Sequence, residues 1–352
     1  MRVVVVGATG NVGTSVVSAL AADQDVTSVV GLARRQPDWS PPKTTWRTVD
    51  VAGGDLAPHL EGADAVVHLA WLFQPTRAPV TTWRNNVLGS IRVFEAAARA
   101  GVSALVHASS VGAYSSAPKD RAVTEEWPTH GWPGAAYGRE KAYVERVLDL
   151  FERDHPGIRV VRLRPGFIFK REAAVGQRRL FGGPFVPQRL VRPSLIPFVP
   201  DTPGLRFQTV HTDDVGEAYR LAVTRPVSGA FNIAADPVIE PSVLAELLGA
   251  RLVPVSGWAL RSTVAAAWHM RLIPASPGLV DLVLRMPIMD IGRARAELGW
   301  QPRHTAVEAM KELFEGLRGA EGAEGMDTPP LSPSTGGPAR LGELAGGVGG
   351  RP

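Results

Sequence analysis

The feature that most constrains the fold is a run of four valines that leads directly into three glycines at fixed spacing. Val3–Val6 are followed by Gly7, Gly10 and Gly13, and the residues after Gly10 have a helical pattern. A buried strand, a tight glycine turn and a helix in this order open a βαβ unit. Gly7 permits the turn, Gly10 lets another group approach the backbone, and Gly13 lets the helix pack closely on the strand.

The same alternation continues to residue 165. Short aliphatic runs alternate with helical patterns, which predicts an α/β fold with a Rossmann-type doubly wound parallel sheet and right-handed crossovers. Strands are expected at Arg2–Val6, Val26–Leu32, Thr45–Val51, Ala65–Leu69, Ala104–Ser109 and Ile158–Leu163. Helices are expected between them at Asn11–Ala21, Thr81–Arg99 and Tyr137–Arg153. A binding cleft is expected at the carboxyl ends of the strands, where the strand order reverses.

After residue 165 the chain becomes rich in proline, and helical patterns return at 212–223, 241–248, 258–272 and 305–317. This predicts a smaller C-terminal substrate lobe over residues 166–318, carried on a Rossmann domain of residues 1–165. Residues 319–352 hold ten Gly, five Pro and no aromatic residue. Such a segment cannot offset its chain entropy by burial, so it is expected to be a disordered tail. A short docking patch at Leu331, Leu341 and Leu344 is the alternative.

The glycine turn also predicts a ligand. The helix that begins after Gly10 presents free backbone N–H groups and the positive end of its dipole, which suit a pyrophosphate. The sequence therefore predicts a dinucleotide site, formed here by Gly7, Thr9, Gly10, Asn11, Val12 and Gly13.

The end of the second strand indicates which dinucleotide binds. An acidic residue at that point would accept a hydrogen bond from the ribose 2′-OH of NAD, whereas arginine suits the 2′-phosphate of NADP. Arg34 and Arg35 stand there, and no Asp or Glu occurs between Asp25 and Asp38. We predict NADP as the cofactor, with NAD as the alternative if the two arginines are only solvated loop charges.

Three further residues predict the chemistry. Tyr137 and Lys141 lie four residues apart, so they share one face of a helix, and Ser110 closes the fifth strand. A lysine ammonium beside a phenol stabilises the phenolate and is expected to lower its pKa toward the working range. The same lysine can hold the nicotinamide ribose, and Ser110 can hydrogen-bond a substrate oxygen. The pattern predicts hydride transfer between a nicotinamide and a secondary alcohol or carbonyl.

Together these residues resemble the extended short-chain dehydrogenase/reductases, specifically the NAD(P)-dependent epimerase/dehydratase family. The glycine spacing and the set of Ser110, Tyr137 and Lys141 carry the resemblance, which extends from Met1 to about Gly319. Further matching motifs are Asp50-Val51, His68-Leu69-Ala70-Trp71, Asn85-Asn86-Val87-x-Gly89, Ser109-Ser110-Val-Gly-Ala-Tyr114, His211-Thr-Asp213-Asp214-Val215 and Leu298-Gly299-Trp300-x-Pro302.

The resemblance implies roles for these positions. Ser110, Tyr137 and Lys141 would be catalytic, and Asn86 would help seat the lysine or the cofactor. The implied cofactor contacts also include Asp50, Val51, Leu69, Ala70, Trp71, Asn86, Tyr137, Lys141 and Pro165. It further implies a homodimer through the helices at 81–99 and 137–153, with apolar positions at Val87, Ile91, Phe94, Val144, Val147 and Leu148, some of which must face the sheet instead.

Three departures from the family pattern bear on the reaction and its substrate. Dehydratases of nucleotide sugars place an acid pair directly after the catalytic hydroxyl, but Val111-Gly112 stand here, so a 4,6-dehydratase is not expected. Phe207 stands where such enzymes carry a diphosphate-binding arginine, with Arg206 beside it, and Arg164-Pro165-Gly166-Phe167 lacks their asparagine. These departures argue against a nucleotide-sugar substrate. Cations that could still serve a phosphate are Lys170, Arg171, Arg178 and Arg179.

The remaining composition narrows partners and location. The longest apolar runs fall short of the ~20 residues that a membrane span needs, and Gly7 interrupts the valine run too early for a signal peptide. The absence of cysteine excludes disulfides and thiolate metal sites and is compatible with the cytoplasm. The eight histidines are scattered, so no metal site is expected. The net charge of +4 without a basic, aromatic-interleaved run argues against nucleic acid as a partner.

These observations predict an NADP-dependent oxidoreductase or epimerase that acts on a small substrate, with sugar-like molecules included. Net oxidoreduction and epimerisation both remain open, since both use the same hydride transfer. A non-catalytic NADP-binding sensor or scaffold is the alternative from another functional class.

Overall fold

The computed structural model describes residues 1–74, 77–181, 196–318, 328 and 331. Most of the predicted tail therefore lies outside the described residues, including Leu341 and Leu344, as does the side chain of Arg179. Thr328 and Leu331 are both buried, and the Thr328 hydroxyl donates to the Thr9 carbonyl at 2.9 Å.

A seven-stranded sheet forms the centre of the molecule, with the order β11-β7-β5-β4-β1-β2-β3 and every neighbouring pair parallel. Its strands are β1 (Arg2–Val6), β2 (Ser28–Ala33), β3 (Thr44–Thr48), β4 (Ala65–His68), β5 (Ala104–Ala108), β7 (Arg159–Pro165) and β11 (Gly229–Ile233). The six predicted strands are all present. The strand β11 was not predicted, because only five residues with a glycine at their start carry its pattern.

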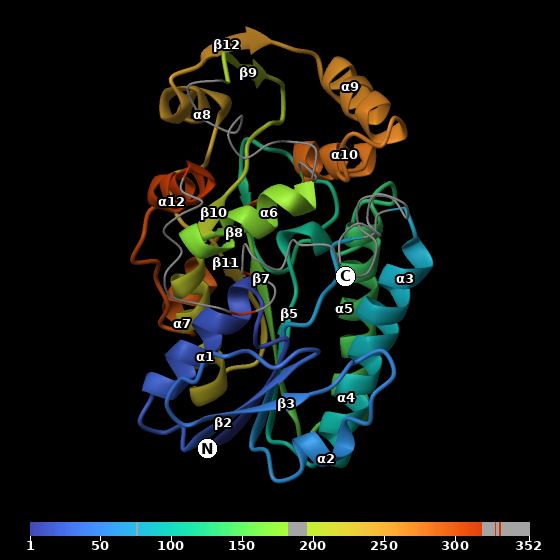
Figure 1. Cartoon of the computed structure of the whole chain (residues 1–352), viewed down its shortest axis with the longest axis vertical. Helices are drawn as coiled ribbons and strands as arrows, with labels where there is room; N and C mark the ends of the chain where they lie inside the picture. The colour runs from blue at the N-terminus through green and yellow to red at the C-terminus, as the bar shows by residue number, and fades with distance from the viewer. Residues whose placement is uncertain (75–76, 182–195, 319–327, 329–330, 332–352) are drawn as a thin grey trace.

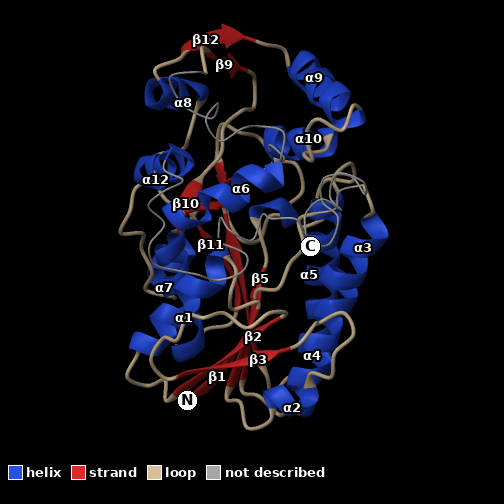
Figure 2. Cartoon of the chain, in the orientation of Figure 1, coloured by secondary structure: helices blue, strands red, loops and turns tan. Residues whose placement is uncertain are grey.

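Helices cover both faces of the sheet, as Figures 1 and 2 show. On one face lie α1 (Asn11–Ala22) and α7 (Thr212–Thr224), and on the other lie α4 (Gly89–Arg99) and α5 (Ala136–Asp154). The valine run serves both layers: Val3 and Val5 pack on the α1 side, Val4 and Val6 on the α5 side. Burial of both faces explains why β1 shows no polar alternation. The doubly wound fold is confirmed.

The predicted helix at 81–99 is in fact three segments. These are α3 (Pro79–Trp83), a π-helical turn η1 (Arg84–Leu88) and α4. A π-helical turn inserts an extra residue into a helix and is frequent at functional sites. Here both Asn85 and Asn86 are brought to the cleft described below.

Elements of the C-terminal half divide between the sheet and the region drawn at the top of Figure 1. The strand β11 and the helix α7 belong to the sheet layers, whereas β9 pairs with β12 beside α8 in the upper region. The remaining elements are β6 (Ala122–Val123), β8 (Phe167–Phe169), β9 (Phe198–Asp201), β10 (Thr209–His211), β12 (Arg251–Pro254), β13 (Ile288–Met289), α2 (Ala57–Leu60), α6 (Ala174–Phe181), α8 (Pro241–Leu248), α9 (Gly257–His269), α10 (Pro277–Arg285), α11 (Gly292–Ala296), α12 (Ala306–Arg318), and the short turns η2 (Val111–Ala113) and η3 (Arg171–Ala173). The division at residue 165 stays a prediction.

The apolar positions proposed for a dimer contact are mostly used inside the monomer. Four of them are buried in the core beneath α4 and α5, namely Val87, Phe94, Val144 and Leu148. The apolar side chains that these helical segments expose are instead Val80, Leu88, Tyr143 and Leu150. None of the described helices is both long and apolar enough to cross a membrane.

Candidate functional site

A cleft opens at the carboxyl ends of β1 and β4, the two neighbouring strands at which the strand order reverses. This is the position expected for ligands in a doubly wound sheet. Of the predicted cofactor residues, those that line it are Gly7, Thr9, Gly10, Arg34, Arg35, Asp50, Val51, Leu69, Ala70, Trp71 and Asn86. Lining residues that the sequence reasoning did not assign to the cofactor are Val6, Leu32, Ala33, Val49, Leu72 and Asn85. All of these except Leu32 are direct chain neighbours of a predicted residue, and Leu32 lies two residues before Arg34. This proximity in the sequence is the signal that could have found them.

The three glycines differ in what surrounds them. Gly7 has a φ of +89°, and a Cβ there would lie 2.7 Å from the Ala70 nitrogen. A Cβ on Gly13 would lie 2.3 Å from the Gly7 carbonyl oxygen, so this glycine lets α1 pack against the turn. A Cβ on Gly10 would meet only that same oxygen, at 3.5 Å. The turn thus leaves an open backbone cradle at Gly10, and these residues fit a dinucleotide.

Several predicted cofactor residues lie outside the cleft lining. The Asn11 side chain donates to the Ile168 carbonyl at 3.3 Å and accepts from the Thr212 hydroxyl at 3.2 Å. Val12 packs against the core on the α1 side, and Pro165 is buried at the end of β7, where it pairs with Ile233.

The two arginines follow the end of β2 at the cleft rim, and both are exposed. The Asp50 carboxylate, which also lines the cleft, accepts from the Ala52 backbone N–H at 2.9 Å. Lys170 is held away from any phosphate role in the cleft, since its buried ammonium donates to the Thr14 hydroxyl on α1 at 2.6 Å.

The structure brings Ser110, Tyr137 and Lys141 together next to this cleft. Tyr137 and Lys141 lie in the first two turns of α5, and Ser110 follows β5. The Ser110 oxygen accepts from the Gly112 N–H at 3.0 Å. Ser110 and Tyr137 lie side by side at Gly112, since a Cβ there would lie 2.7 Å from Cε1 of Tyr137 and 3.4 Å from the Ser110 oxygen. The Lys141 ammonium donates to the Ala108 carbonyl at 2.6 Å. It also lies 3.4 Å from the centre of the Trp71 ring, a cation–π contact.

The pKa of Tyr137 differs from the expectation. Burial raises the pKa of Tyr137 to about 12, and the interaction with the Ser110 side chain opposes this rise only partly. Burial also lowers the pKa of Lys141 to about 7. The expected lowering of the phenol pKa by the ammonium is absent because Lys141 points to Ala108 and Trp71, with its nitrogen 5.9 Å from the Tyr137 ring centre.

Asn86 is buried and holds the loop that follows β4. Its side-chain oxygen accepts from the Leu72 N–H at 2.7 Å, and its amide nitrogen donates to the Leu72 carbonyl at 2.8 Å. The same nitrogen donates to the carboxyl group of Glu140, the residue before Lys141, at 2.7 Å. Asn86 therefore joins the cleft wall to the helix that carries the lysine.

Aromatic rings surround Tyr137, and sequence reasoning had not assigned Phe73 or Phe181 to the site. Phe73 stacks on Tyr137 with ring centres 4.6 Å apart and an interplanar angle of 16°. Phe181 lies edge-on to Phe73 at 5.9 Å, and Trp71 lies edge-on to Tyr137 at 6.0 Å. The two aromatic residues that follow the fourth strand, Trp71 and Phe73, were the sequence signal that could have indicated this aromatic wall. Among the described residues, no cluster of three His, Asp or Glu side chains could hold a metal ion.

The family model of the NAD dependent epimerase/dehydratase family matches residues 3–193, more than half of the chain. The chain belongs to this family. An uncharacterised protein from Mycobacterium tuberculosis is 28% identical over 260 residues, which cover 72% of this chain and 65% of the relative. The chain thus spans slightly less than two thirds of the length of this relative. The L-arabinose 1-dehydrogenase (NAD(P)(+)) of Haloferax volcanii is 32% identical over 178 residues, 47% of this chain and 67% of that protein.

Solved structures of epimerase/dehydratase proteins share the fold. MoeE5 in complex with UDP-glucuronic acid and NAD has a TM-score of 0.67 and 24% identity, covering 90% of this chain and 99% of that one. The Thermus thermophilus UDP-glucose 4-epimerase complex with NAD has a TM-score of 0.66 and 22% identity, covering 91% and 100%. The expected family resemblance is confirmed.

Proposed function

We propose that this member of the epimerase/dehydratase family is an NADP-dependent oxidoreductase or epimerase that acts at a secondary alcohol or carbonyl. The observation that carries the proposal is the gathering of Ser110, Tyr137 and Lys141 next to the cleft at the carboxyl ends of β1 and β4. No contact in the described part of the structure specifically favours the alternative, a non-catalytic NADP-binding sensor or scaffold.

The residues of the chain would divide the chemistry as follows. A bound nicotinamide supplies or accepts a hydride at its C4 carbon. In the oxidising direction Tyr137 takes the proton of the substrate hydroxyl while the hydride leaves the same carbon, so that a carbonyl forms. In the reducing direction Tyr137 returns that proton to the oxygen. Ser110 hydrogen-bonds the oxygen, and Lys141 holds the ribose and favours the phenolate once its ammonium turns toward the phenol.

The surroundings of Gly112 support the absence of a 4,6-dehydratase activity. A Cβ at Gly112 would lie 2.7 Å from Cε1 of Tyr137. An acidic side chain at this position, as elimination of water would use, has to displace the catalytic ring. We therefore propose redox or epimerase chemistry without dehydration.

The aromatic contacts of Tyr137 favour a small substrate with a flat apolar portion beside the reacting carbon. Phe73 and Phe181 offer ring faces and edges instead of hydrogen-bonding groups for sugar hydroxyls. Arg206, the residue beside the expected diphosphate-binding position, pairs with Glu240 at 2.8 Å and donates to the Lys119 carbonyl. A nucleotide sugar is the alternative, and parallel assays with aryl ketones and nucleotide sugars distinguish the two.

The function is tested by Tyr137→Phe, with Tyr143→Phe as a matched control on the same helix. Tyr143 is 46% exposed and lies six residues after Tyr137 on the same helix. Loss of the proton donor should lower kcat by about 10² to 10⁴-fold, while Tyr143→Phe keeps wild-type turnover. The affinity for NADP should stay within a few-fold in both variants.

Turnover is followed by nicotinamide absorbance over a panel of alcohols and ketones. Wild-type protein that binds NADP but turns over no member of the panel would favour the sensor. Undiminished turnover by Tyr137→Phe would refute the role of the tyrosine.

A further inference from the structure

Three side chains of α5, one from each of three successive helical turns, meet the residues at the end of β5. Lys141 donates to the carbonyl of Ala108, Glu145 accepts from the hydroxyl of Ser109 at 2.5 Å, and Tyr137 lies beside Ser110. Positions four residues apart lie on one face of a helix, so Tyr137, Lys141 and Glu145 form a single row. Two members of this row are in the proposed catalytic set, and Glu145 has no role assigned so far.

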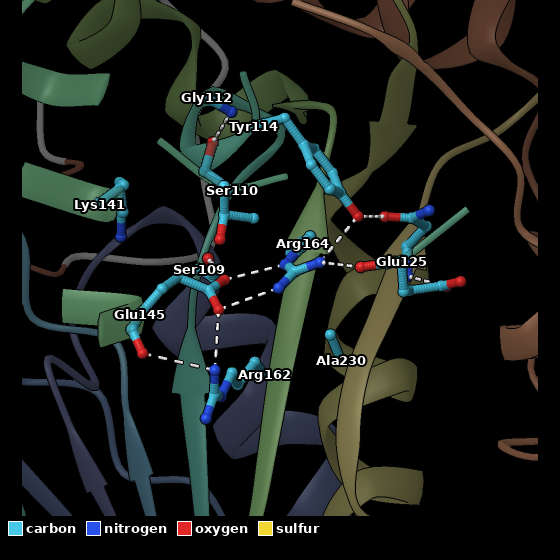
Figure 3. A network of polar contacts seen from close by, with 12 residues as sticks. Ser109, Ser110, Gly112, Tyr114, Glu125, Lys141, Glu145, Arg162, Arg164 and Ala230 are labelled. Atoms are coloured by element: carbon cyan, nitrogen blue, oxygen red, sulfur yellow. Dashed lines mark hydrogen bonds and ion pairs between the residues drawn. The ribbon is translucent and has the colours of Figure 1, made fainter. Parts of the chain in front are cut away.

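Glu145 is a fully buried carboxylate with strong partners (Figure 3). Its Oε1 accepts from Arg164 Nε at 2.9 Å as well as from Ser109, and its Oε2 accepts from Arg164 Nη2 at 2.9 Å and from Arg162 Nη1 at 3.1 Å. Burial alone would raise the pKa of Glu145, but the bidentate bonds from Arg164 and the charge of Arg162 hold it at about 2. The group is therefore ionised at neutral pH.

The same network holds the other end of the loop that contains Ser110. Arg164 Nη1 donates to the Tyr114 hydroxyl at 3.0 Å and to the Glu125 carbonyl at 2.8 Å. The Tyr114 hydroxyl in turn donates to Asn232 on β11 at 2.6 Å. Ser110 and Gly112 thus lie between Ser109 and Tyr114, and both of these residues are bound to the Glu145–Arg164 pair.

We propose that Glu145, with Arg164, is a positioning residue that fixes the Ser109–Tyr114 loop so that Ser110 meets Tyr137 in reactive geometry. The proposal rests on the proposed function of Ser110 and Tyr137. Replacing a buried ion pair by packed apolar residues is often neutral or favourable for stability, so stability alone is weak grounds for such a pair. Positioning of Ser110 is a better explanation of the buried pair, because a small misplacement of a catalytic group lowers the rate by a large factor.

The test separates positioning from stability by a variant that leaves the ions in place. Ser109→Ala removes only the hydroxyl that reaches Glu145, while the bonds between Glu145 and the two arginines remain. We expect kcat to fall by about tenfold or more, with KM and the NADP dissociation constant unchanged within about twofold. Glu145→Gln should show a larger fall in kcat together with a lower melting temperature.

Glu152→Gln is the matched control. Glu152 also pairs with Arg162, but it lies two turns further along α5 and bonds neither Ser109 nor Arg164 in the described structure. Its removal should leave kcat at the wild-type level. A fall in melting temperature without a fall in the kcat of folded Ser109→Ala would overturn the proposal, and this variant decides the matter even if Glu145→Gln does not fold.

Crystal structures of wild type and Ser109→Ala add a measurement independent of turnover. The proposal expects a longer distance between the Ser110 hydroxyl and the Tyr137 hydroxyl in the variant, and an unchanged distance contradicts it. Wild-type protein without any turnover would be a failure of the proposed function, whereas this distance would still decide the positioning role.

Discussion

Burial dominates the charge states of the proposed catalytic residues. It raises the pKa of Tyr137 to about 12 and lowers the pKa of Lys141 to about 7, so burial favours the uncharged form of both groups. The aromatic wall of Trp71 and Phe73 provides the low-polarity surroundings. Glu145 behaves in the opposite way because two arginines compensate its charge.

The lysine predicts a pH dependence of stability. Because burial lowers the pKa of Lys141 from 10.5 to about 7, the unfolded chain holds this proton more tightly than the folded protein. The destabilisation is fully present below pH 7, and it disappears as the pH rises toward 10.5. The free energy of unfolding of Lys141→Met should therefore exceed that of wild type at pH 6. This difference should become smaller by a few kcal/mol when the pH is raised to 10. Urea unfolding of both proteins across this range tests it, and a pH-independent difference would contradict it.

The arginines at the cleft rim predict cofactor preference. A hydrogen bond to a charged group contributes about 1.5–3 kcal/mol, so one such bond from Arg34 or Arg35 to a 2′-phosphate implies about tenfold or greater preference for NADP over NAD. The double variant Arg34→Ala, Arg35→Ala should lose this preference and keep its NAD affinity, because the pyrophosphate that both cofactors share is expected at the glycine turn. Arg99→Ala, which changes an exposed arginine on α4, is the control. Titration of each protein with NADP and with NAD at fixed ionic strength measures this preference. Equal or better binding of NAD by wild type would show that the NADP assignment is wrong.

At the scale of elements, the packing of α1 on its turn and the break in the long helix position the cleft. Gly13 brings α1 against the Gly7 carbonyl, which directs the free N–H groups of the helix start toward the cradle at Gly10. The π-helical turn Arg84–Leu88 then presents Asn86 to the loop after β4. Both features act on the same cleft from opposite walls.

Two glycine variants separate packing from binding at this turn. Gly13→Ala forces a Cβ to 2.3 Å from backbone oxygen, so it should destabilise the protein by about 1–3 kcal/mol or more and weaken NADP binding. Gly10→Ala meets only ordinary contact at 3.5 Å, so it should cost little stability while still weakening binding by obstructing the cradle. Thermal unfolding and NADP titration distinguish them. Equal loss of stability in both variants would speak against this division of roles.

At the scale of the whole molecule, the helical layer that contains α5 exposes several apolar side chains. Leu88, Tyr143 and Leu150 are 45%, 46% and 54% exposed, although their helices bury Val87, Val144 and Leu148 beneath them. Exposed apolar surface of this kind can mark a protein–protein contact. We propose that a second copy of the chain covers this surface and forms the homodimer expected from the family.

The dimer is tested by placing a charge on that surface. Leu150→Arg should give a monomer by light scattering at micromolar concentration, with unchanged circular dichroism, because an unpaired charge is costly in an apolar contact. Met270→Arg, at a residue that is 68% exposed just after α9, should keep the wild-type mass. A monomeric wild type would contradict the proposal.

The sequence by itself determined the features that depend on neighbouring residues. A valine strand that meets Gly7, Gly10 and Gly13 has few alternatives, because backbone sterics and the need to bury both faces of a strand act locally. The cleft position and the lining residues Gly7, Thr9 and Gly10 followed from this pattern, whereas Asp50, Val51, Leu69, Ala70, Trp71 and Asn86 were predicted from the family resemblance. The spacing of Tyr137 and Lys141 likewise implied a shared helix face.

Only the tertiary structure decided what depends on residues far apart in the chain. The stacking of Phe73 on Tyr137, the contact of Lys141 with Trp71 and the bonds that join Ser109, Glu145 and Arg164 all cross between elements. No periodicity records them, and they set the pKa values of the site through burial and charge. The sequence therefore determined which groups stand at the cleft, whereas long-range packing decided their protonation and their partners.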